Sequence, residues 1–289
     1  MSEERTVRHN RLNKKFQESK YSTVINSAKG ARVGVFHNND IPLPKCPEIQ
    51  PAFSRVLERV VRKLTRCFPD LIHSLYVYGS VAEGRAEAGK SDLDMTIIFR
   101  HKLDQTTTEQ LAAIQAELEK NNSIISKIDF DCGLLEQVLN QDNVLSWGYW
   151  LKHHCRCVYG EDLSHRFQAF KPSKAIAIAV NGDFQQVLNR LITQMKMSSD
   201  ENKKLQFLRS AARKLVRSTN ILRSEQDNDW PGSLQEHRIR FIARYPSLAN
   251  DMDELMAMSS GARGNLADSE KRLINFANWL NAEFQSHKF

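Results

Sequence analysis

Hydrophobic residues between positions 53 and 132 follow two different spacings, one helical and one alternating. From Phe53 to Leu64 they recur at helical spacing, and Pro69 ends the pattern, which predicts an amphipathic helix. A second helix is predicted from Thr106 to Lys120. The predicted strands are LIHSLYVYGS at 71–80, DLDMTIIF at 92–99 and SIISKIDFDC at 123–132. A helix before the sheet and a crossover helix within it predict an α/β domain.

After residue 163 the pattern becomes helical, and no strand is convincing beyond about residue 165. Ser233 and Glu236 have the spacing of a capping box, which predicts a helix start before HRIRFIARY. Further helices are predicted around 184–195, 205–222 and 273–284. We therefore expect a helical bundle at 164–289, after an α/β domain at 46–163. Residues 1–45 have no sustained apolar period and are interpreted as a basic N-terminal extension.

The composition is that of a globular protein without a membrane segment. The chain has 289 residues, and 41% of them are hydrophobic, which is enough to bury a core. No apolar run approaches the roughly 18 residues that a membrane helix needs, and the N-terminus MSEERTVRHNRLNKKF is charged where a signal peptide is apolar. The five cysteines are odd in number and do not suggest a secreted disulfide framework. We expect a cytoplasmic protein that does not associate with membranes.

Charge is distributed unevenly along the chain, whose net charge is +7. Residues 1–50 carry a net charge of +4, residues 51–163 carry −3, and residues 164–289 carry +6. Basic flanks around an acidic centre are consistent with a phosphate-rich partner that meets a metal-binding site. Surface lysines and arginines on helices explain most positive net charges of this size, so the charge supports the hypothesis of nucleic-acid binding only modestly.

Acidic residues alternate with apolar ones in two of the predicted strands. Asp92 and Asp94 lie two residues apart, so their side chains project from the same face of the strand. Asp129 and Asp131 form a second such pair. If the two strands are neighbours, three carboxylates meet at one face of the sheet, and their mutual repulsion is relieved by a hard divalent cation with oxygen ligands, Mg²⁺ above all.

Gly79 and Ser80 follow the first predicted strand and supply the features of a phosphate site. Glycine at a strand-to-helix turn lets backbone N–H groups approach an anion closely, and the Ser80 hydroxyl is a donor to a phosphate oxygen. Together with the aspartates, these residues fit a nucleoside triphosphate bound with magnesium.

Gly79-Ser80, eleven intervening residues and then Asp92-Leu93-Asp94 resemble the signature of the DNA polymerase beta-like nucleotidyltransferases. The later acidic strand in KIDFDCGLL is similar to the strand that carries the family's third carboxylate. The length and domain order resemble small two-domain members such as the aminoglycoside adenylyltransferases. The resemblance implies a nucleotidyltransferase domain, α/β or α+β with a mixed sheet, followed by an all-α bundle that binds substrate.

The resemblance also implies roles for individual residues. Asp92, Asp94 and Asp129 become the catalytic and metal-binding carboxylates, and Asp131 is the alternative to Asp129 as the third carboxylate. One or, more typically, two Mg²⁺ ions are implied, with Mn²⁺ as a possible substitute and ATP or another nucleoside triphosphate as co-substrate. The implied nucleotide-binding residues are Gly79, Ser80, Arg85 and Ser91. Further candidates for contact with phosphate or substrate are Lys90, Arg213, Lys214 and Arg217.

The acceptor of the nucleotide is left open by the sequence. The first choice is a hydroxyl of a small molecule, such as an aminoglycoside-like compound, with AMP transferred from ATP and pyrophosphate released. Transfer to RNA or tRNA, as in toxin-like or tailing relatives, is the alternative, supported by the basic flanks. Transfer to a protein and a non-catalytic nucleotide-binding regulatory module are further alternatives. The nucleotide preference, the oligomeric state and the role of the N-terminal extension are not determined by the sequence.

Overall fold

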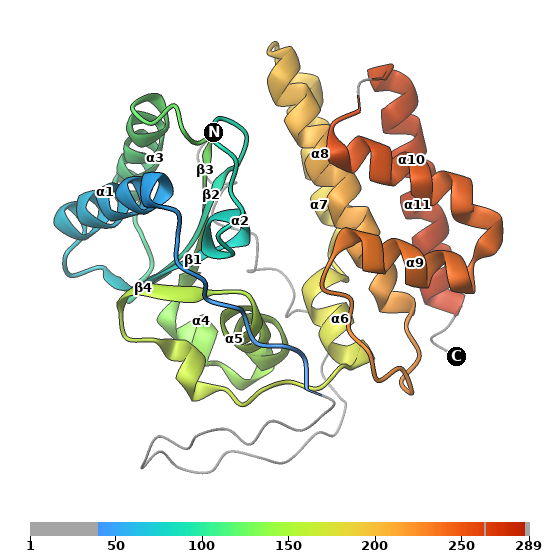
Figure 1. The fold of residues 1–289 in the computed structure, drawn as a ribbon, viewed down its shortest axis with the longest axis horizontal. Coiled ribbons are helices and arrows are strands. Elements are labelled where there is room, and N and C mark those ends of the chain that lie inside the picture. The colour runs from blue at the N-terminus through green and yellow to red at the C-terminus, as the bar shows by residue number, and fades with distance from the viewer. Residues whose placement is uncertain (1–39, 263, 287–289) are drawn as a thin grey trace. The chain divides into compact units, whose positions relative to one another are not determined.

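A computed structural model describes residues 40–262 and 264–286, and the chain divides into two compact units (Figure 1). The first unit extends to Phe170 and the second begins at Lys171. The predicted N-terminal extension, residues 1–45, lies almost wholly outside the described residues. Residues 164–170 belong with the first unit, since the backbone N–H of Ile41 donates to the carbonyl of Phe170. The units therefore divide seven residues later than the predicted domain boundary.

The first unit is built on a four-stranded mixed sheet with the strand order β3-β2-β1-β4. Strand β1 is antiparallel to both β2 and β4, whereas β2 and β3 run parallel. The prediction of a mixed sheet with helices is confirmed. The elements that follow the predicted order are α1 (Pro51–Cys67), β1 (Ile72–Tyr78), the short α2 (Gly79–Ala82), β2 (Leu93–Phe99), α3 (Gln105–Lys120) and β3 (Ile128–Leu134).

Helices cover both faces of this sheet (Figure 1). Helices α1 and α3 pack on one face through a hydrophobic cluster that contains Leu64, Ile97 and Ile114. Trp147 and Leu151 pack on the other face, from a segment that contains α4 (Leu135–Leu139), a π-helical turn (Val144–Gly148) and α5 (Tyr149–His153). The sequence pattern did not predict this second layer, because helices of five residues are too short to show a period.

Two parts of the strand prediction differ from the structure. The first half of SIISKIDFDC is a turn, in which the N–H of Ile125 donates to the carbonyl of Asn122 and the N–H of Ser126 donates to the carbonyl of Ser91. Strand β3 therefore begins only at Ile128. In addition, the sequence did not predict strand β4 (Arg156–Gly160), which pairs with β1 at the edge of the sheet.

The second unit is helical, as predicted, and encloses its own hydrophobic core. Ser233 caps a helix as expected, because its hydroxyl accepts from the N–H of Glu236. No helix within residues 40–262 and 264–286 is both long and apolar enough to cross a membrane. The main helices of this unit are α6 (Lys174–Asn181), α7 (Phe184–Met197), α8 (Glu201–Ser218), α9 (Leu234–Arg244), α10 (Ala249–Ser260) and α11 (Leu266–Ser286); of these, α6 and α10 were not predicted.

Candidate active site

The strand register brings the predicted carboxylates together at one end of the sheet. Asp94 in β2 pairs with Tyr78 in β1 on one side and with Asp129 in β3 on the other. Asp92 lies on the same face, two residues before Asp94. One carboxylate oxygen from each of Asp92, Asp94 and Asp129 lies within 4.8 Å of the other two. Such a set of oxygen donors fits a hard divalent cation such as Mg²⁺.

Gly79 makes room for one of these carboxylates. Its φ of +71° lies in the left-handed region, where a side chain is strained. A Cβ at this position would lie 2.5 Å from Oδ2 of Asp94, closer than any non-bonded carbon and oxygen can approach. Glycine is therefore required both by the turn from β1 into α2 and by the position of the Asp94 carboxylate.

The surroundings of Asp94 disfavour the negatively charged form of its side chain. Burial and, to a smaller extent, the neighbouring carboxylates of Asp129 and Asp92 together raise the pKa of its carboxyl group to about 7. A carboxylate in this position is stabilised by a cation placed among the three oxygens. The electrostatics of the cluster therefore agree with its geometry in indicating a cation site.

Lys127 places a positive charge at the edge of this cluster. Its ammonium lies 2.5 Å from Oδ2 of Asp129 and 3.5 Å from Oδ2 of Asp92. Burial opposes its charge, but Asp129 and Asp92 outweigh that effect and raise the pKa of the lysine. The hydroxyl of Ser126 donates to Asp92 as well. The sequence prediction omitted Lys127, although it stands two residues before Asp129 and the alternation of a strand places the two on one face.

Asp131, the alternative third carboxylate, lies deeper in the sheet than Asp129. It pairs with Thr96 in the register, its side chain is 8% exposed, and its Oδ2 accepts a hydrogen bond from the hydroxyl of Tyr78. It does not belong to the carboxylate cluster that the described residues form. The structure therefore groups Asp92 and Asp94 with Asp129 rather than with Asp131.

Comparison with known proteins identifies the domain that carries this site. The family model described as polymerase beta, nucleotidyltransferase matches residues 62–147, which include β1, β2 and β3 with the three clustered aspartates. Residues 62–147 form a nucleotidyltransferase domain of the polymerase beta type. A search of curated proteins found no match.

A solved structure resembles the chain well beyond this domain. It is the crystal structure of spectinomycin adenyltransferase AAD(9) from Enterococcus faecialis with ATP and spectinomycin. The similarity has a TM-score of 0.53 at 13% sequence identity, and it covers 80% of this chain and 99% of that chain. At this identity the similarity shows a shared fold only: a domain with a mixed sheet followed by a helical region, as the sequence predicted.

The other predicted residues of the nucleotidyltransferase domain lie in or beside the loop between α2 and β2. Ser80 is partly buried in α2, and the hydroxyl of Ser91 accepts from the backbone N–H of Glu87. Arg85 and Lys90 are exposed, and each pairs with a nearby glutamate of the same loop. The structure thus places Ser80 directly after the glycine of the site, whereas Arg85 and Lys90 lie on the surface.

The three basic candidates of the bundle lie on α8, in the second unit. Arg213 donates through Nε to the carbonyl of Ser259, 3.1 Å away. The ammonium of Lys214 lies 2.6 Å from Asp183 and also donates to the carbonyl of Val180. Arg217 is exposed. Arg213 and Lys214 therefore connect α8 to other parts of the bundle, whatever further role they have.

Proposed function

We propose that this protein transfers a nucleoside monophosphate, AMP from ATP, to a hydroxyl of a small aminoglycoside-like molecule and releases pyrophosphate. The observation that carries the proposal is the convergence of Asp92, Asp94 and Asp129 beside Gly79 in a domain of the nucleotidyltransferase family. The similarity to an adenyltransferase whose structure was solved with ATP and spectinomycin supports the choice of nucleotide and acceptor.

The three carboxylates are suited to hold Mg²⁺, which Mn²⁺ would replace, and two ions are proposed. When bound, the ions screen the charge of the triphosphate and stabilise the attacking and leaving oxygens of an in-line displacement. The backbone at Gly79 and the hydroxyl of Ser80 hold a phosphate group beside the carboxylates. Asp92 and Asp94 orient the triphosphate, and Asp129 is the base that attracts the proton of the acceptor hydroxyl. The new bond joins the acceptor oxygen to the α-phosphorus as the bond to pyrophosphate breaks.

The proposal is tested by incubating the protein with α-labelled ATP, Mg²⁺ and, in separate reactions, aminoglycosides, total tRNA and cell lysate. We expect label in the small molecule together with release of pyrophosphate. Label in RNA would instead support the alternative acceptor, and binding of that RNA would weaken steeply as salt is raised. Label in a protein would support the third acceptor class. Absence of label in every pool would contradict nucleotidyl transfer to these acceptors.

The two aspartates of β3 differ in what their loss should cost. Asp129→Asn should reduce kcat by about 10³-fold, because it removes a cluster carboxylate and the proposed base. Asp131→Asn should reduce kcat less than about tenfold and should mainly lower stability, since its partner is the hydroxyl of Tyr78. Steady-state kinetics and thermal unfolding of both variants measure this difference. If Asp131→Asn proves the more damaging to kcat, Asp131 is the third carboxylate.

Lys127 should compete with the metal ion for the carboxylates. Lys127→Met should raise the affinity for Mg²⁺ several-fold in titration calorimetry, because a positive charge beside the site is removed. In EDTA the same variant should lose roughly 1–3 kcal/mol of stability, because Asp92 and Asp129 lose their ion-pair partner. Lys63→Met, which removes an exposed pair with Glu117 in the same unit, is the control. Unchanged Mg²⁺ affinity in Lys127→Met would contradict the competition.

A further inference from the structure

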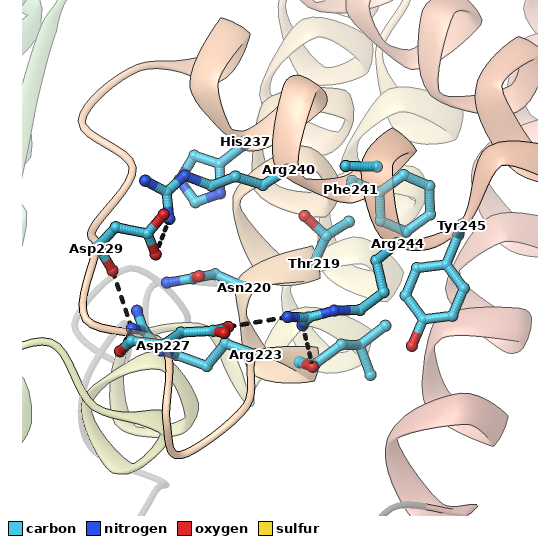
Figure 2. Close-up of a pocket in the computed structure, with 12 residues that line it drawn as sticks. Thr219, Asn220, Arg223, Asp227, Asp229, His237, Arg240, Phe241, Arg244 and Tyr245 are labelled. Carbon is cyan, nitrogen blue, oxygen red and sulfur yellow. Dashed lines mark hydrogen bonds and ion pairs between the residues drawn. The ribbon is translucent and has the colours of Figure 1, made fainter.

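The second unit contains a cavity that the nucleotidyl-transfer chemistry does not use. It has a volume of about 350 Å³ and lies beside α9, the 3-10 turn Thr219–Leu222 that follows α8, and the loop between them (Figure 2). This volume is at the lower end of the range for small-molecule sites. Three arginines line it, Arg223, Arg240 and Arg244, together with Asp227 and Asp229.

Two of the three arginines form ion pairs with carboxylates, and the third forms none with the described residues. Arg240 pairs with Asp229, and Arg244 pairs with Asp227 at 2.9 Å (Figure 2). Arg223 forms no ion pair with any carboxylate in the described part of the chain, although its side chain is among the most buried charged groups there, with 3% exposed. The pocket therefore holds one more positive charge than negative charges, and that excess belongs to a buried group. Burial lowers the pKa of Arg223, and the nearby carboxylates of Asp227 and Asp229, which form no ion pair with it, offset this effect only in part.

The hydrogen bonds of Arg223 are incomplete as well. Its Nη2 donates to the backbone carbonyls of Asp227 and Asp229, and its guanidinium carbon lies 4.9 Å from the centre of the Trp230 ring. Its Nε and Nη1 are buried and have no hydrogen-bond partner among the residues that the structure describes. These contacts fix the plane of the guanidinium but leave two of its donor nitrogens without an acceptor.

Asn220 adds a third unsatisfied donor to the same cavity. The residue is 8% exposed, and its amide nitrogen Nδ2 has no hydrogen-bond partner within residues 40–262 and 264–286. Figure 2 shows this amide nitrogen pointing toward the side of the pocket where Arg223 and Asp229 lie. Burial and the nearby Arg217 and Arg240 lower the pKa of His237, another lining residue, to about 3, so it adds no charge. Within the described residues, the buried side-chain atoms of this cavity that have no hydrogen-bond partner are therefore all donor nitrogens.

We infer that this pocket binds the oxyanion of a small molecule, a carboxylate or a phosphate group, between Arg223 and Asn220. An oxyanion supplies both the missing charge and the missing acceptors, whereas a water molecule supplies only acceptors. The guanidinium group binds carboxylate and phosphate oxygens in the same geometry, so both belong to the inferred class. A polycationic ligand is excluded by the three arginines. Leu222 and Phe241 also line the cavity, and their apolar side chains suit an uncharged body attached to the anion.

The test uses the full-length protein in EDTA at constant chloride, titrated with millimolar inorganic phosphate or with acetate. We expect at least one of these anions to raise the Tm in a saturable way. Asn220→Ala should shift the midpoint of that titration by about tenfold, the effect of one hydrogen bond to a charged group, and Arg223→Met should abolish the response. Arg238→Met, on α9 but outside the pocket, should respond like the wild type. Stronger binding of phosphate identifies a phosphate ester as the ligand class, and stronger binding of acetate identifies a carboxylate.

A non-specific salt effect would raise the Tm of every variant equally. A wild type that does not respond, or an Asn220→Ala variant that responds at the same midpoint, would overturn the inference. Asn220→Ala keeps the loop contacts of Arg223, so the test remains decisive if Arg223→Met does not fold. Asp94→Asn should retain the full response, which separates this pocket from the nucleotide site: the inference can fail without affecting the proposed function, and the reverse also holds.

Discussion

Asp94→Asn should abolish nucleotidyl transfer without destabilising the metal-free protein. Asp94 is the central carboxylate, paired in register with both Tyr78 and Asp129. Its replacement removes a cation ligand, and we expect a loss of about 10³-fold or more in kcat/KM. In EDTA, however, the amide removes negative charge from a partly buried position that already faces Asp92 and Asp129. The Tm without metal should therefore equal or exceed that of the wild type.

The combination of these two results separates a catalytic carboxylate from a structural one. Mg²⁺ should raise the Tm of the wild type and leave that of Asp94→Asn almost unchanged. Asp70→Asn, an exposed position in the same unit, should behave like the wild type in both measurements. A marked loss of stability of Asp94→Asn in EDTA would show that the carboxylate is held by favourable contacts within the fold and not poised for a cation.

Gly79→Ala should reduce kcat/KM by about 100-fold, because a shift of the order of 1 Å in a catalytic group has this effect. The new methyl group would lie 2.5 Å from Oδ2 of Asp94, so the carboxylate must move away from Asp92 and Asp129. The left-handed backbone at φ +71° adds a cost of about 1–2 kcal/mol in stability. Enzyme kinetics and thermal unfolding of the same preparation measure the two effects.

Gly89→Ala is the matched control for this variant. Gly89 has a φ of +72°, almost the same as that of Gly79, but a Cβ there would meet no atom of the described residues within 4 Å. The two variants should therefore lose similar stability from backbone strain, while only Gly79→Ala loses most of its activity. If both variants lose the same activity, backbone strain at the substituted glycine, and not displacement of Asp94, accounts for the loss of activity.

The fold of the first unit could be predicted from the sequence where its elements were long enough to show a period. Strand β2 was recognised because apolar residues alternate with Asp92 and Asp94, and α1 because its apolar face is continuous from Phe53. The parallel pairing of β2 and β3 could not be derived from periodicity, which carries no information about neighbours. The adjacency of these strands was only a condition in the prediction from the sequence, and it is this pairing that brings Asp129 to Asp94.

The residues that the sequence missed have tertiary partners that no local pattern shows. Lys127 forms an ion pair with Asp92, which is distant from it in the sequence. Arg223 is typical of an exposed loop arginine by its polar neighbours, yet it is buried beside Trp230. Arg85 and Lys90 were candidates for phosphate contact from their place between the two halves of the motif, with a solvated loop as the alternative, and their side chains pair with acidic neighbours on the surface.

The central claim, that Asp92, Asp94 and Asp129 form a metal-dependent nucleotide site, is tested most directly by ATP binding, which needs no knowledge of the acceptor. Titration calorimetry with a non-hydrolysable ATP analogue should show binding in the presence of Mg²⁺ that weakens at least tenfold in EDTA. Asp94→Asn and Asp129→Asn should abolish the dependence on Mg²⁺. Binding that is equally strong with and without Mg²⁺ in the wild type, or unchanged by Asp94→Asn, would contradict the claim.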